Sequence, residues 1–257
     1  IMHASSNSID PREVRHYDRL ARTWWDTSGP FWPLHRLNKL RSVYIKTQLC
    51  RHFGLPADAA APLKGLTVLD VGCGGGILAE SMTRLGARVL GIDVVEKNIT
   101  IARQHAEASG LQIDYQLTTA ESLAASGLMF DVVLNMEVVE HVSDLPGFTR
   151  AVCKLLKPGG MMFIATINRT ALAWLIAIVG AEYILRWMPK GTHRWAMFRR
   201  PDEVRNLLAV NGLMVKHLVG VGVDPLRKQM FLTRLKSVNY MLTASHALDS
   251  RPENPPL

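Results

Sequence analysis

The sequence predicts an α/β protein with a doubly wound, mostly parallel sheet of seven strands. From residue 66 onward, short apolar stretches alternate with helical stretches that often end at a glycine, the pattern of buried parallel strands and their connecting helices. A glycine-rich turn joins the first of these strands to a helix, where open α/β sheets bind ligands. The chain of 257 residues, 48% of them hydrophobic, can form a single domain around one sizeable core.

The N-terminal residues, roughly 10 to 55, predict a helical cap on that sheet. Asp10 can cap a helix that has Pro11 at its first position and Glu13 at its third, a common way for a helix to begin. A second helix is expected over roughly residues 37–53. Pro and Gly residues then mark residues 54–65 as a linker.

The alternating region supplies the sheet and its covering helices. Strands are expected at residues 66–72, 88–94, 113–119, 130–136 and 160–168, and helices at residues 77–86, 98–110 and 144–156. Two later strands, roughly residues 213–221 and 237–243, complete the seven. The last residues, 250–257, are expected to be a disordered tail.

An apolar helical insertion, roughly residues 170–200, follows the fifth strand. Its uninterrupted apolar part ends at Glu182, well short of the roughly 20 residues that span a bilayer. Trp174 and Trp187 flank it, and basic residues follow. This composition suits a helix lying in a membrane interface. A buried helix that covers the active site is the alternative, and both interpretations can hold together.

Charge and cysteine content restrict the environment. The net charge of +8 suits an anionic membrane surface, an anionic ligand or nucleic acid, but no basic segment with interleaved aromatics resembles a nucleic-acid motif. We therefore expect no nucleic-acid partner. The three widely spaced cysteines, Cys50, Cys73 and Cys153, indicate a reducing compartment, and the first residues lack the apolar core of a secretory signal.

The glycine-rich turn indicates S-adenosylmethionine rather than a dinucleotide. Gly72 and Gly74 allow a close approach of backbone to ligand, but Ile77 stands where a dinucleotide fingerprint has Gly or Ala. Asp70, two residues before the first glycine, would repel a pyrophosphate and suits a ligand with a cationic end. Asp93 ends the next strand and can accept hydrogen bonds from both ribose hydroxyls, and Glu121 is placed near an adenine edge. A turn that only packs helix on sheet is the alternative.

With these features the chain resembles the class I S-adenosylmethionine-dependent methyltransferases, and "LLKPGGMMFIATIN" is similar to their segment leading into the fifth strand. Within that class it resembles the ubiquinone-biosynthesis O-methyltransferases. The likeness runs from roughly Tyr17 to Leu242, nearly the whole chain. It is carried by the stretches "WWDTSGPFWPLHRLNKLR", "LDVGCGGGILAESMTRLGA", "NMEVVEHV", "VGAEYILRWMPKGTH" and "VNYML". The stretch "GVDPLRKQMFLTRLKS" departs from the family pattern, which affects the expected substrate contacts near the C-terminus.

The resemblance implies methyl transfer from S-adenosylmethionine to phenolic oxygens of polyprenylated ubiquinone precursors. It places the family's cofactor positions at Arg41, Gly72, Asp93 and Met136, with Arg41 bound to the methionine carboxylate. It also implies a lipophilic polyprenyl phenol substrate, a peripheral membrane location and contact with other ubiquinone-biosynthesis proteins. The site would face the cytoplasm at a bacterial inner membrane or the matrix at a mitochondrial inner membrane.

In "NMEVVEHV", Glu137, Glu140 and His141 fall at i, i+3 and i+4, one face of a helical turn. A phenol with a pKa of about 10 needs a base or a cation to favour its phenolate at neutral pH. We therefore expect either a divalent metal held by the three side chains, Mg²⁺ with Zn²⁺ as the alternative, or His141 and Glu137 acting without metal. A purely structural role in shaping the pocket is the third interpretation. The resembled family is described as metal-dependent, which favours the metal site.

Two other functions are compatible with the sequence. One is a class I methyltransferase for another small phenol or for nitrogen or carbon. The other is a catalytically silent scaffold subunit of a biosynthetic complex, which the intact set of Asp70, Gly72, Gly74 and Asp93 disfavours.

Overall fold

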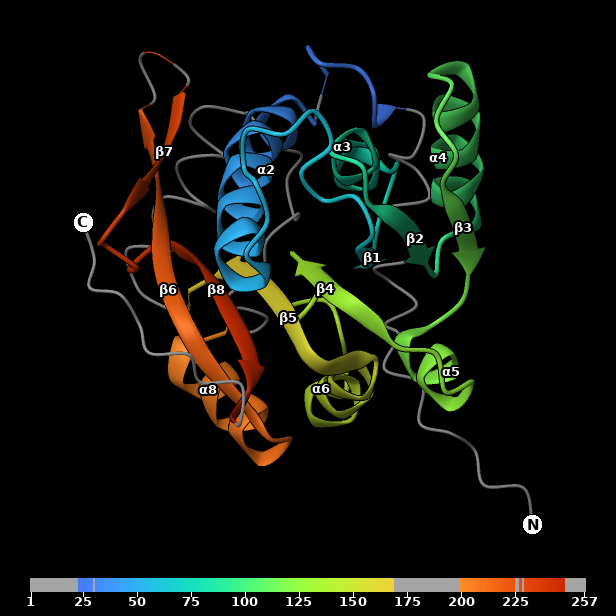
Figure 1. Cartoon of the computed structure of the whole chain (residues 1–257). Helices are drawn as coiled ribbons and strands as arrows, with labels where there is room; N and C mark the ends of the chain where they lie inside the picture. The colour runs from blue at the N-terminus through green and yellow to red at the C-terminus, as the bar shows by residue number, and fades with distance from the viewer. Residues whose placement is uncertain (1–22, 30, 169–198, 225–226, 228, 248–257) are drawn as a thin grey trace.

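The computed structural model describes residues 23–29, 31–168, 199–224, 227 and 229–247. In this part of the chain a central sheet has strand order β3-β2-β1-β4-β5-β8-β6-β7 (Figure 1). The strands from β3 to β5 in this order are parallel, and β8, β6 and β7 are antiparallel. The strands are β1 Thr67–Val71, β2 Arg88–Asp93, β3 Asp114–Leu117, β4 Phe130–Met136, β5 Leu156–Ile167, β6 Leu213–Asp224, β7 Gln229–Thr233 and β8 Asn239–His246.

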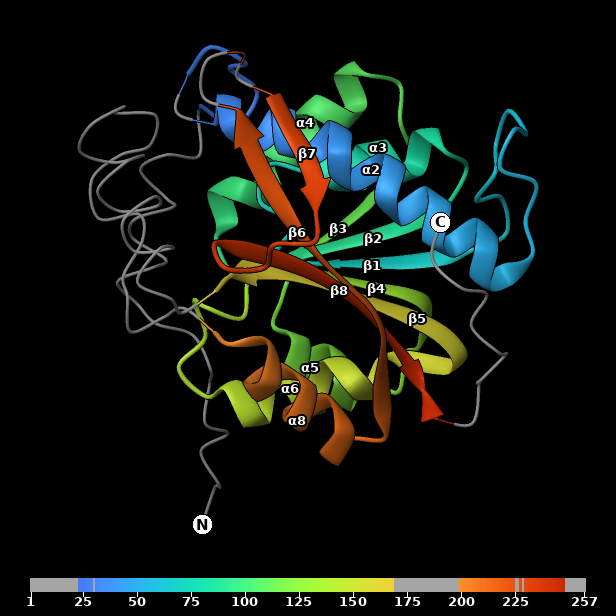
Figure 2. The same cartoon turned by 90° about the vertical axis from the view of Figure 1, so that its left-hand side faces the viewer.

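Helices cover both faces of the sheet, as expected for a doubly wound fold (Figure 2). Each face has its own buried cluster of apolar side chains. Fully buried Leu134 belongs to the first cluster and fully buried Leu69 to the second. On the first face lie α2 Trp32–Phe53, α3 Ile77–Arg84 and α4 Glu96–Ala108, and on the second lie α5 Ala120–Ala125, α6 Leu145–Lys154 and α8 Pro201–Val210.

The predicted α/β fold is confirmed, with one more strand than the seven predicted. The extra strand is β7, which forms a hairpin with β6 and pairs Gln229 with Asp224. The sequence analysis missed it because residues 222–236 mix charged and apolar side chains without a clean alternation. It also missed the short helices α5 and α8. Helix α2 begins at Trp32, earlier than predicted, with Pro33 in its first turn.

Three expectations fall outside the described residues: the helix after Asp10, the apolar insertion of residues 170–200 and the tail of residues 250–257. Across the described part of the chain, no helix combines the length and apolarity needed to cross a bilayer.

Asp131 joins the starts of three strands at the end of the sheet opposite the glycine turn. Its carboxylate accepts hydrogen bonds from the Thr67 backbone N–H at 2.8 Å, from Thr67 Oγ1 at 2.6 Å and from Lys157 Nζ at 3.0 Å. Partial burial raises the pKa of Asp131, but the hydrogen bonds from Thr67 and Lys157 outweigh it and leave the pKa below its ordinary value.

Replacing this carboxylate should destabilise the fold without touching the site. We expect Asp131→Ala to lower the free energy of unfolding by about 0.5–1.5 kcal/mol at neutral pH, because partly buried donors lose their acceptor. A lowered pKa stabilises the fold above the unfolded-state pKa, and this stabilisation is lost as pH falls through the folded-state value. Denaturant unfolding at neutral and acidic pH measures both effects, and equal stability of variant and wild type at neutral pH would contradict the role.

Candidate functional site

A cavity of about 380 Å³ opens at the carboxyl ends of the parallel strands. Strands β1, β2 and β4 each contribute their last residues or the residues that follow. All ten residues singled out from the sequence line this one cavity. They are Arg41, Asp70, Gly72, Gly74, Asp93, Glu121, Met136, Glu137, Glu140 and His141. The predicted site residues therefore come together in space, although their individual roles are a separate question.

The turn after β1 requires glycine at the predicted positions. Gly72 and Gly74 have φ values of +67° and +54°, a region that side chains disfavour. A Cβ at Gly72 would lie 2.6 Å from Val138 Cγ2, and one at Gly74 would lie 2.5 Å from the Trp24 ring. The backbone of the turn thus lies close to Val138 and Trp24, and the absence of side chains at Gly72 and Gly74 leaves the adjoining cavity open.

Asp93, at the end of β2, is held by the chain itself. Its carboxylate accepts hydrogen bonds from the backbone N–H groups of Gly74 at 2.9 Å and Val95 at 2.8 Å, and from Asn98 Nδ2 at 3.3 Å. Burial raises the pKa of this carboxyl, and these donors oppose the rise. The hydrogen bonds fix the carboxylate at the cavity wall.

Asp70, the last residue but one of β1, is not satisfied in the same way. The residue is 3% exposed, and its Oδ2 atom has no hydrogen-bond partner within the described residues. Burial and then the charge of Asp93 raise the pKa of Asp70 to about 7, while Arg41 opposes the rise. A buried acceptor that lacks a donor at a cavity wall fits a cationic ligand group, such as the ammonium of S-adenosylmethionine.

The segment after β4 is a turn, and the predicted helix at this place is wrong. Glu137 has a φ of +58°, the only positive value of a non-glycine residue in the described chain, and the His141 N–H donates to the Val138 carbonyl at 2.8 Å. The left-handed backbone at Glu137 breaks the helical periodicity from which the i, i+3, i+4 argument started. Glu137, Glu140 and His141 nevertheless all line the cavity.

The two glutamates lie close together and differ in their surroundings. Glu137 forms a close ion pair with the Arg41 guanidinium, which is itself buried. Glu140 is 6% exposed and accepts a hydrogen bond from Thr166 Oγ1 at 2.8 Å. Burial is the largest cause that raises the pKa of Glu140 well above its ordinary value. The negative charge of Glu137 and a hydrogen bond with Glu137 raise this pKa further. The pair therefore favours one protonated and one ionised carboxyl.

The described residues contain no group of three or more His, Cys, Asp or Glu side chains placed to hold a metal ion. The helical geometry from which the metal site was predicted is absent, so Glu137, Glu140 and His141 as metal ligands stay a prediction. Arg41 lines the cavity and its guanidinium is paired with Glu137, while its predicted bond to the methionine carboxylate stays a prediction.

Sequence reasoning missed several residues that complete the site. Trp24 and Asn98 line the cavity and form a hydrogen bond from Trp24 Nε1 to Asn98 Oδ1 at 2.8 Å. Thr118, Thr119 and Met230 line it as well. Asn98 could have been found from its place in the first turn of the helix after β2, whereas nothing local predicts that the Trp24 ring packs on the distant glycine turn at Gly74 and Gly75.

Comparison with known proteins first gives the class. Residues 69–164 match the family model described as a methyltransferase domain. The fold is similar to the crystal structure of magnesium protoporphyrin IX methyltransferase from Synechocystis PCC 6803 with bound SAH, with a TM-score of 0.62 and 17% identity over 91% of this chain and 94% of that one. Fold, glycine turn and cavity together define a class I S-adenosylmethionine-dependent methyltransferase.

The sequence relatives then give the family. The chain is 48% identical to a ubiquinone biosynthesis O-methyltransferase of Bartonella bacilliformis over 94% of this chain and 98% of the relative. It is 50% identical to a ubiquinone biosynthesis O-methyltransferase of Brucella anthropi over 92% of this chain and 96% of that relative. This protein belongs to the ubiquinone biosynthesis O-methyltransferase family, and it is an S-adenosylmethionine-dependent O-methyltransferase.

Asp70, whose Oδ2 atom has no hydrogen-bond partner among the described residues, should make cofactor binding depend on pH. Only the ionised carboxylate can accept a hydrogen bond from an ammonium, so S-adenosylhomocysteine should bind more tightly as pH rises through about 7. Asp70→Asn should weaken binding by about 1.5–3 kcal/mol above this pH and flatten the profile. Calorimetry from acidic to mildly alkaline pH measures both, and an unchanged profile in Asp70→Asn would show that another group is responsible.

Proposed function

We propose that this enzyme transfers a methyl group from S-adenosylmethionine to a phenolic oxygen of a polyprenylated ubiquinone precursor. The observation that carries the proposal is that one cavity is lined both by the carboxylates Asp70 and Asp93 and by Glu137, Glu140 and His141. Apolar side chains, among them Val142, Phe148, Ile167 and Met230, complete the wall. The printed function of the relatives supports the choice of acceptor.

The chemistry requires an acceptor oxygen that has lost its proton. When bound, S-adenosylmethionine supplies an electrophilic methyl group on a sulfonium. His141 is our proposed acceptor of the phenol proton, since it lines the same cavity as the glutamate pair, which favours one ionised carboxyl. Glu137, ionised beside Arg41, is proposed to stabilise the imidazolium that results. Buried Glu140 is proposed to hold the proton shared by the pair.

Removing the proposed base should affect turnover much more than cofactor binding. We expect His141→Ala to lower kcat by about 10²- to 10⁴-fold on a prenylated catechol, with the Kd for S-adenosylhomocysteine unchanged. Activity should recover partly at high pH, where the phenol ionises without a base. His52→Ala is the control, because His52 hydrogen-bonds the Gly159 carbonyl at the far end of the sheet. Wild-type turnover in His141→Ala would rule out this base.

Chelation separates the metal-free route from the metal-dependent one implied by the family. If His141 acts alone, turnover should persist in excess EDTA. Loss of turnover that Mg²⁺ or Zn²⁺ restores would support Glu137 and Glu140 as carboxylate ligands instead. Cofactor binding without turnover on any catechol, with or without metal, would favour the scaffold function.

We also propose that the enzyme binds anionic membranes peripherally, where a polyprenyl substrate resides. The β6–β7 hairpin and the residues after it support this: Phe231, Leu232 and Leu235 are 49%, 40% and 74% exposed, and Arg227 and Arg234 are exposed nearby. Apolar side chains among cationic ones suit an anionic bilayer surface. The hairpin also carries Met230 to the cavity wall. The apolar insertion is proposed to contribute to the same contact.

The location follows from the proposed substrate. The bacterial sources of the relatives favour the cytoplasmic face of an inner membrane over the mitochondrial matrix side. We extend the proposal to contact with other ubiquinone-biosynthesis proteins at that surface.

Charged side chains at the hairpin should release the protein from vesicles. We expect Phe231→Asp with Leu235→Asp to reduce sedimentation with vesicles that contain anionic lipid, and added salt to weaken wild-type binding. Val210→Asp is the matched control, since Val210 is 86% exposed but lies at the end of α8. Equal loss in the control, or no wild-type binding at low salt, would contradict the hairpin as a docking surface.

A further inference from the structure

Two adjacent tryptophans, Trp24 and Trp25, contact the glycine turn from a segment that precedes α2. Trp24 is 7% exposed, and its ring packs directly on the turn. A Cβ added at Gly74 or Gly75 would lie 2.5 Å from Trp24 atoms. Any larger residue at either position would therefore push the ring away from the turn.

Trp24 is linked to the carboxylate at the end of β2. Its Nε1 donates to Asn98 Oδ1 at 2.8 Å, and Asn98 Nδ2 donates to Asp93 Oδ1 at 3.3 Å. The ring stacks on Phe31 with 4.0 Å between centroids and an interplanar angle of 7°. Since Trp24 and Phe31 both line the cavity, this stacked pair forms a wall of the cofactor site and orients the Asn98 amide toward Asp93.

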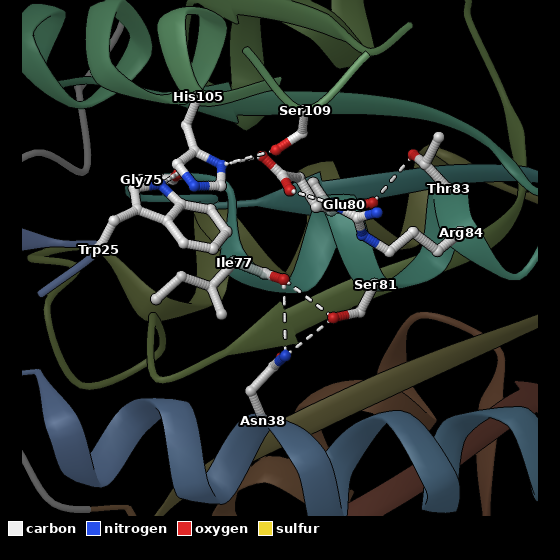
Figure 3. Close-up of polar contacts among 11 residues, drawn as sticks. Trp25, Asn38, Gly75, Ile77, Glu80, Ser81, Thr83, Arg84, His105 and Ser109 are labelled. Atoms are coloured by element: carbon white, nitrogen blue, oxygen red, sulfur yellow. Dashed lines mark hydrogen bonds and ion pairs between the residues drawn. The ribbon is translucent and has the colours of Figure 1, made fainter. Parts of the chain in front are cut away.

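Trp25 holds the turn by a different contact. Its Nε1 donates to the Gly75 carbonyl at 2.8 Å (Figure 3). The ring stacks on His105 of α4, with 3.4 Å between centroids and an interplanar angle of 1°. His105 Nδ1 lies 2.6 Å from Glu80 Oε1 of α3, and the Glu80 side chain is 3% exposed. Trp25 thus joins the glycine turn to a contact between two helices outside the cavity.

We propose that Trp24 and Trp25 are positioning residues of the cofactor site. Trp24 orients the Asp93 carboxylate through Asn98. Trp25, whose ring stacks on His105, fixes the position of the glycine turn against which the cofactor binds. The acceptor of the methyl group plays no part in these contacts, so the proposal concerns cofactor affinity alone. A test of cofactor affinity is therefore independent of the proposed phenol substrate and of the proposed base.

Conservative variants remove the two indole N–H groups and keep an aromatic ring at each position. Trp24→Phe and Trp25→Phe should each raise the Kd for S-adenosylhomocysteine by about 3- to 10-fold, as expected for one lost hydrogen bond that acts through a neighbour. The KM for a soluble catechol should stay unchanged. Trp32→Phe is the control, because Trp32 lies at the start of α2 and is absent from the described lining of the cofactor cavity.

A double-mutant cycle shows whether His105 acts through Trp25. His105→Ala should raise the Kd for S-adenosylhomocysteine in the wild-type background and have no further effect in Trp25→Ala. Circular dichroism and thermal unfolding of each variant establish that the fold is intact. An unchanged Kd in both phenylalanine variants, or an equal effect of His105→Ala in both backgrounds, would overturn the proposal. If an alanine variant fails to fold, the Kd values of the phenylalanine variants decide whether the proposal holds.

Discussion

The site depends on two buried carboxylates at the ends of neighbouring parallel strands. Pairing of Val71 with Ile92 brings the carboxyl ends of β1 and β2 side by side, and with them Asp70 and Asp93. Each charge disfavours the other in a region from which water is largely excluded. The chain satisfies Asp93 with its own donors, whereas Asp70 Oδ2 has no hydrogen-bond partner among the described residues, so a ligand with a cationic group would complete the arrangement.

The glycine turn and Arg41 stabilise this pair of buried carboxylates, Asp70 and Asp93. The glycine turn gives a backbone N–H to Asp93, which a bulkier turn could not do because the Trp24 ring occupies the space beside it. Arg41, the cation that opposes the rise in the pKa of Asp70, is also paired with Glu137. One buried guanidinium therefore connects the cofactor half of the site electrostatically with the half proposed to receive the phenol.

The cofactor half could be predicted from sequence because it rests on local rules. Strand ends follow from short apolar runs, and parallel strands bring Asp70 and Asp93 to one edge. Glu137, Glu140 and His141 line the cavity as predicted, but their backbone differs from the expected helical turn, since a left-handed φ at Glu137 has no local signal of the kind that glycine provides. Strand β7 and the packing of Trp24 on the turn were missed because long-range pairing and packing decide them.

The titration of Asp70 tests the central claim most directly. Carboxyl ¹³C NMR, with Asp70→Asn to assign the signal, should show Asp70 titrating near pH 7 in the free enzyme. Its pKa should fall when S-adenosylhomocysteine binds, because the ligand ammonium favours the ionised form. An Asp70 that titrates near the ordinary aspartate value in the free enzyme, with no change on binding, would show that this carboxylate is already satisfied without the cofactor and would contradict the account.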